Sequence, residues 1–251
     1  MEDMSIKDYL AQGGVLSSPA NVPPRYRAEL LKIMASFVDS ELAGSAGFAD
    51  VINTAPGIRE RISAAKIVLE KAANAEKVLT LMGEFGADTA RYANSHPWNA
   101  RLERSADIGA ARGEHDMRLA VFNYPLDGWG DAVVMNLLMG LAVGVQMQDL
   151  CRVSYQPLAE AFRAIAPIEA RHAELAAHGL ARLTEEGQGE SLQASVAYWW
   201  PRVAASFGSV TSNKADSLLA MGLRHSTNAD QRAQWEAKAE QALNALGLKR
   251  P

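Results

Sequence analysis

The chain has 251 residues, of which 48% are hydrophobic and 22% are charged, and its formal net charge is -4 at pH 7. This composition is typical of a globular protein, and the acidic balance argues against nucleic acid or an anionic membrane as the main partner. A single cysteine, Cys151, excludes an internal disulfide and fits a reducing cytoplasm. The acidic start of the chain shows no signal peptide.

The periodicity of apolar residues predicts an all-α fold. Gly, Ser and Pro are frequent in residues 1–25, which predicts an N-terminal arm outside the core of one helical domain over residues 26–251. Four bundle helices are expected, over about 26–43, 58–85, 129–153 and 157–185. Further helices are expected near 191–207, 215–224 and 229–246.

Helix boundaries and burial also follow from local signals. Gly44 and Gly47 are expected to end the first helix. The apolar run 132–147 is short for a membrane span and contains Asn136 and Gln146, so the third helix should be the buried central one. The polar stretch 87–120 predicts a long connection with one short helix, suited to an interface or to substrate contact.

Glu169 and His172 occupy the apolar stripe of the helix predicted over 157–185, one turn apart. A buried carboxylate needs a partner, because burying it unpaired costs several kcal/mol or shifts its pKa. Ferritin-like bundles hold a pair of metal ions with Glu-x-x-His motifs of this kind. The alternative is an internal ion pair or a hydrogen-bonded Glu and His.

Each of the other three bundle helices also carries polar residues in its stripe. Glu41 continues the stripe of the first helix, and Lys71 and Asn74 lie on the inner face of the second, with Glu70 facing outwards. Asp131 opens the third helix, as either an N-cap or a ligand. The second helix therefore shows Lys-x-x-Asn where the ferritin-like pattern has Glu-x-x-His.

Several short motifs resemble the catalytic large-subunit family of phenylacetyl-CoA epoxidases, the di-iron monooxygenases of phenylacetate catabolism. The resemblance covers about residues 27–229, without 90–115, and rests on these stretches: Asp39-Ser40-Glu41-Leu42-Ala43-Gly44, Ala55-Pro56, Phe122-Asn123-Tyr124-Pro125, Trp129-Gly130-Asp131, Cys151-Arg152-Val153-Ser154-Tyr155, Glu169-Ala170-Arg171-His172 and Trp199-Trp200-Pro201. It implies a ferritin-like fold and a reductase partner, with iron ligands at Glu41, Asp131, Glu169 and His172.

In that family, the remaining Glu and His ligands fall on Lys71 and Asn74 of this chain. An ammonium cannot ligate a metal and repels cations. We therefore predict that Lys71 forms a salt-bridge cluster with Glu41, Asp131 or Glu169. The expected cofactor is either none or a single iron or other divalent metal on Asp131, Glu169 and His172, and two irons are not expected.

Two functions follow from this sequence. The first is an oxygenase subunit that acts on phenylacetyl-CoA or another aryl-CoA thioester. The second is a non-catalytic scaffold subunit of a ferritin-like oxygenase complex, forming a homo-oligomer or pairing with another ferritin-like subunit. Two metal sites would favour the first function, and a metal-free cluster around Lys71 would favour the second.

Overall fold

The computed structural model describes residues 5–113, 116–209 and 215–251, so residues 1–4 of the predicted arm lie outside it. The part of the chain that it describes contains α-helices and short 3-10 helices but no strand, which confirms the all-α class. The α-helices are α1 (Ile6–Ala11), α2 (Pro24–Val51), α3 (Ile58–Glu84), α4 (Thr89–Ser95), α5 (Gly128–Leu150), α6 (Gln156–Glu185), α7 (Gly189–Ala205), α8 (Ala215–Ala220) and α9 (Asn228–Ala245).

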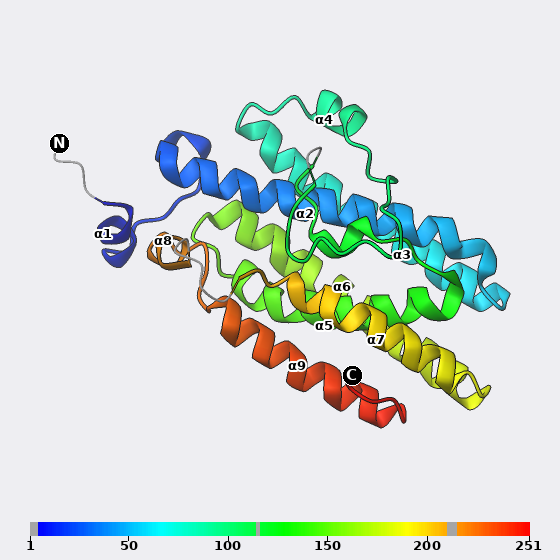
Figure 1. The fold of residues 1–251 in the computed structure, drawn as a ribbon. Coiled ribbons are helices and arrows are strands. Elements are labelled where there is room, and N and C mark those ends of the chain that lie inside the picture. Colours follow the sequence, from blue (N-terminus) through cyan, green and yellow to red (C-terminus); the bar gives the residue numbers. More distant parts are fainter. Residues whose placement is uncertain (1–4, 114–115, 210–214) are drawn as a thin grey trace.

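The four longest helices form a closed bundle. Helix α2 packs on α3, α3 on α6, α6 on α5, and α5 on α2, while α7 and α9 cover the outer side of α5 (Figure 1). Helix α5 is the one described helix that is long and apolar enough to cross a membrane, and 67% of its most apolar window is buried inside the molecule. Its apolar character therefore follows from its central place, with helices on several sides.

The first bundle helix is longer than predicted, because α2 continues through Gly44 and Gly47 to Val51. A Cβ atom at Gly44 would lie 3.2 Å from the ring of Phe122, and one at Gly47 would lie 2.9 Å from the Arg101 guanidinium. These two glycines leave room for bulky neighbours inside a helix and do not terminate it. Helix α5, in contrast, ends at Leu150, before the predicted end at 153.

The segment predicted as an arm outside the core in fact contributes to the core. Leu16 and Val22 are buried in the cluster that α2, α3 and α6 share. The backbone of Leu16 also accepts a hydrogen bond of 2.8 Å from the amide of Gln156, at the start of α6. The Gly- and Ser-rich composition hid these two apolar anchors.

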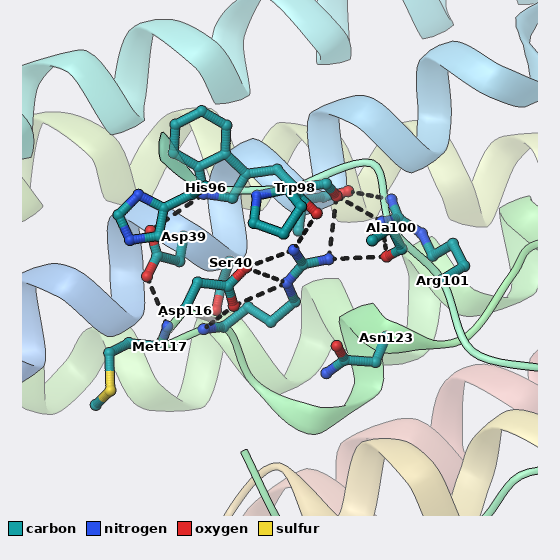
Figure 2. Close-up of polar contacts among 12 residues, drawn as sticks. Asp39, Ser40, His96, Trp98, Ala100, Arg101, Asp116, Met117 and Asn123 are labelled. Carbon is teal, nitrogen blue, oxygen red and sulfur yellow. Dashed lines mark hydrogen bonds and ion pairs between the residues drawn. The ribbon is translucent and has the colours of Figure 1, made fainter. Parts of the chain in front are cut away.

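Asp39 of α2 holds the long polar connection against the bundle (Figure 2). Its fully buried carboxylate accepts hydrogen bonds from the Tyr92 hydroxyl at 2.8 Å, the Trp98 indole at 3.1 Å and the Met117 amide at 2.7 Å. Ser40, the next residue, accepts the amide of Leu119 at 3.0 Å. One polar turn of α2 therefore fixes several separate points of the connection.

Arg118 provides the internal support of the same connection. Its buried guanidinium pairs with Asp116 and donates to the backbone carbonyls of Pro97, Trp98 and Ala100. Arg101 also donates to the carbonyls of Trp98 and Ala100, so two guanidinium groups bind the backbone of this irregular segment, whose carbonyls have no helical partners. The described residues of the connection thus form a layer over α2.

Replacing Asp39 with alanine removes the shared acceptor of three partly buried donors in the connection. We expect Asp39→Ala to lower the free energy of unfolding by about 3 kcal/mol and to expose residues 88–119 to proteolysis. Urea unfolding and limited proteolysis measure the two effects. The control is Asp50→Ala on the exposed side of α2, and equal effects of the two variants would contradict the anchoring role.

Candidate functional site

Lys71 of α3 lies in the bundle core between two carboxyl groups from different helices. Its Nζ is 2.9 Å from Oε1 of Glu41 on α2 and 3.0 Å from Oε2 of Glu169 on α6. The three residues expose only 8%, 4% and 2% of their surfaces, respectively. The ammonium thus links α2, α3 and α6 in a place that water hardly reaches.

Asn74, one turn further along α3, completes the contacts of the same two carboxyl groups. Its Nδ2 donates to Oε2 of Glu41 at 3.3 Å and to Oε1 of Glu169 at 3.0 Å. Lys71 and Asn74 therefore both act as donors toward Glu41 and Glu169. Of the three acids predicted as possible partners of Lys71, two therefore pair with it, Glu41 and Glu169.

His172 stands between two carboxylates on the other side of Glu169. Its Nε2 is 2.8 Å from Oε2 of Glu70, and its Nδ1 is 3.4 Å from Oε1 of Glu169. Arg171 binds the second oxygen of Glu70 at 2.6 Å. The prediction that Glu70 faces outwards was wrong: its side chain is only 18% exposed, because two basic residues of α6 draw it across the α3–α6 contact.

Asp131 does not join this cluster, contrary to the prediction that placed all four acidic and imidazole groups at mid-bundle. Arg104 donates two hydrogen bonds to it, of 2.7 and 3.0 Å, and the Trp199 indole donates a third of 2.9 Å. The amide of Asp127, the N-cap residue of α5, donates a fourth. These donors satisfy the carboxylate of Asp131, which lies where α5, α7 and the long connection meet.

Burial and charge give the two clustered carboxyl groups opposite properties. Burial, together with the nearby charge of Glu169, raises the pKa of Glu41 to about 8. Burial alone would also raise the pKa of Glu169, but the Lys71 ammonium and His172 hold it well below its ordinary value. Burial opposes the charge of Lys71, yet the two carboxyls raise the pKa of its ammonium. One cation thus serves two acids, and Glu41 keeps its proton near neutral pH.

Two cavities adjoin the cluster. A cavity of about 30 Å³ lies beside Lys71 and Glu169, which is room for about one or two water molecules. A larger cleft of about 570 Å³ reaches Glu41 from the surface, with apolar walls that include Phe37, Met139 and Met147. Its volume is in the range of clefts that hold small molecules.

These residues do not fit a pair of metal ions. The Lys71 ammonium contacts both Glu41 and Glu169, and an ammonium repels any cation placed between them. Among residues 5–113, 116–209 and 215–251, no group of three or more His, Cys, Asp or Glu side chains is arranged to hold a metal ion. Of the predicted ligands, Glu41, Glu169 and His172 lie together and Asp131 lies apart.

Comparison with known proteins places the chain in a family. The sequence profile described as "Phenylacetic acid catabolic protein" matches residues 8–251. The chain belongs to this family. It is also 24% identical over 247 residues to one subunit of the 1,2-phenylacetyl-CoA epoxidase of Escherichia coli strain K12, an alignment that covers 96% of this chain and 75% of the relative. The recognised resemblance is therefore confirmed for the family.

Sequence reasoning missed three charged residues around the sites of this family member. Arg104 pairs with Asp131. Glu70 contacts His172, and Arg171 pairs with Glu70. A buried Asp131 does signal that a cation must lie nearby, because such a charge is seldom unpaired. The sequence offers several arginines in 87–120 and no spacing that selects Arg104.

The charge of Lys71 should matter greatly for stability, because without it Glu41 and Glu169 face each other unpaired. We expect Lys71→Met to lower the free energy of unfolding by about 3–5 kcal/mol. Adding Glu41→Gln and Glu169→Gln should recover part of the loss, since no buried charge then remains. Urea unfolding tests this, with Lys77→Met on the exposed face of α3 as control. Similar losses in Lys71→Met and Lys77→Met would contradict the bridging role.

The raised pKa of Glu41 predicts a pH-dependent stability. The folded protein binds a proton at a pKa of about 8, whereas the ordinary value is 4.5. The stabilisation from this proton is complete below pH 4.5 and is lost as the pH rises through 8. The lowered pKa of Glu169 acts only on the acid side, since its stabilisation is present above the ordinary value.

Glu41→Gln imitates the protonated acid at every pH. We expect its melting temperature, relative to wild type, to rise between about pH 6.5 and about pH 9. Differential scanning fluorimetry at both values measures this difference. Glu76→Gln, an exposed substitution on α3, is the matched control and should show no such change. A pH-independent difference for Glu41→Gln would contradict a Glu41 pKa of about 8, because it would show that the protonation of Glu41 does not change in this range.

Proposed function

We propose that this chain is a metal-free, non-catalytic subunit of a ferritin-like oxygenase complex of phenylacetate catabolism. The observation that carries the proposal is the ammonium of Lys71 between Glu41 and Glu169. In a di-iron site, metal cations would balance the carboxylates of the bundle. Here a protein cation and a retained proton balance them.

The surrounding contacts support the same conclusion. Asn74 presents its NH2 group to both carboxyls and thus acts as a donor, whereas a metal ligand would have to be a lone-pair acceptor. Asp131 is bound by Arg104 and Trp199. The groups that the family resemblance assigned to metal binding thus have protein partners that hold the bundle together.

Assembly with other chains is the second part of the proposal. The relative from Escherichia coli is named as one subunit of an epoxidase, so it belongs to an enzyme with more than one kind of chain. We propose that this chain likewise works in the cytoplasm within an assembly, and that its partner is another ferritin-like subunit. Its role there is to supply a rigid helical scaffold.

The cleft that has Glu41 in its wall favours the alternative, an epoxidase-like oxygenase that binds an aryl-CoA thioester. Its volume of about 570 Å³ and its apolar walls suit the aryl end of such a molecule. Oxygen chemistry beside Glu41 would require metal where the Lys71 ammonium now lies. The metal content of the purified chain therefore separates the two functions.

We expect the wild-type chain, purified from iron-supplemented cells, to contain no stoichiometric iron. The double variant Lys71→Glu/Asn74→His should take up iron, because it replaces a cation and an amide with two metal ligands. The matched control, Lys71→Met/Asn74→Leu, removes the ammonium without adding ligands and should stay metal-free. Metal analysis by mass spectrometry and ferrous-ion titration measure the uptake.

Affinity purification of the tagged chain from its own cells supplies the second readout. We expect it to elute in a defined complex with an oxygenase subunit that contains iron. Two irons per wild-type chain, together with oxygen-dependent consumption of phenylacetyl-CoA by this chain alone, would contradict the proposal and establish the oxygenase function.

A further inference from the structure

Helix α3 carries a second apolar stripe on the side opposite to Lys71. Ile58, Ile62 and Leu69 are 77%, 63% and 69% exposed, and they are three of the five large apolar side chains that the described residues expose most. Ala65, which is also exposed, lies between them. The spacing of four, three and four residues is that of a helix seam that packs against another helix.

Such a stripe differs from the scattered apolar residues of an ordinary surface. Single exposed apolar residues are common and need no explanation, whereas a continuous row marks an interaction site. The inner face of α3, which includes Ala64, Ile67 and Val78, is already buried in the bundle. Helix α3 therefore has one face for its own bundle and another that the described residues leave open.

Cations flank the stripe on both sides. Arg59 and Arg61 are exposed beside Ile58 and Ile62, and Lys66 follows next to Ala65 with its side chain 53% exposed. Of the nearby carboxylates of α3, Glu60 pairs with Arg182 of α6, and Glu70 pairs with Arg171 at 2.6 Å and with Lys66 at 3.9 Å. The open face is thus an apolar seam with a basic border.

We propose that this stripe docks an amphipathic helix of a different protein, whose apolar seam is bordered by Asp and Glu. Acidic residues beside the partner's seam would complement Arg59, Arg61 and Lys66. A second copy of this chain would instead bring two basic borders together. The inference rests on the proposed subunit role and names the surface that serves it.

The test uses two synthetic helical peptides. Both have leucine at the a and d positions of each heptad, and the residues beside this seam are glutamate in one peptide and lysine in the other. Fluorescence anisotropy with the full chain should show binding of the acidic peptide only, and this binding should weaken from about 0.05 M to about 0.5 M NaCl. Ile62→Ser/Leu69→Ser should weaken it at least about tenfold. The charge variant Arg59→Glu/Lys66→Glu should reverse the preference between the two peptides.

Val15→Ser alters another exposed apolar residue and is the matched control, which should bind like wild type. Equal binding of both peptides, or binding unaffected by Ile62→Ser/Leu69→Ser, would overturn the inference. Light scattering that shows a wild-type dimer and a monomeric Ile62→Ser/Leu69→Ser variant would overturn it in favour of a second copy.

Purification of the tagged variants separates this inference from the proposed function. If wild type enters a complex and Ile62→Ser/Leu69→Ser does not, the stripe is the docking surface. If both enter it, the subunit role stands and the inference about α3 fails. If wild type enters no complex, the subunit role fails, and the peptide measurement still decides whether the stripe binds an acidic helix.

Discussion

The ammonium of Lys71 is the interaction on which the centre of this bundle depends. It lies within 3.0 Å of an oxygen of Glu41 and of Glu169, so one charge from α3 is shared with α2 and α6. A charge buried in this way must be matched, because the protein interior solvates it far less than water does. Asn74 and the proton held by Glu41 complete the balance. The helices can therefore approach each other only in the arrangement that keeps these groups paired.

A second polar centre lies in the first turn of α5, beside α7 and the long connection. Asp131 joins α5 to α7 through the Trp199 indole and to the long connection through Arg104, whose guanidinium also lies 3.8 Å over the Tyr198 ring. Together with Asp39, it attaches the described residues of this polar connection to the bundle. Each buried acid in these contacts has several donors, which is the condition under which buried charges are tolerated.

Helix α3 links the interior of the molecule to its proposed surroundings. Its inner face supplies the ammonium that pairs with Glu41 and Glu169, and its outer face presents the row from Ile58 to Leu69. The two faces suit a protein whose site maintains structure and whose surface makes contacts with other chains. We propose that this chain supplies structure and contacts to its complex, while another subunit carries out the chemistry.

The sequence by itself determined the helical class, the family and the inward direction of Lys71, Asn74, Glu169 and His172. These follow from the 3.6-residue period, which depends only on neighbours along one helix, and from the short motifs. Tertiary structure decided which groups meet. Asp131 binds Arg104, Glu70 turns to His172, Gly44 makes room for Phe122, and Leu16 reaches the core. Each of these contacts joins separate elements of the chain, and the pattern along one helix carries no information about which distant side chain will lie opposite to it.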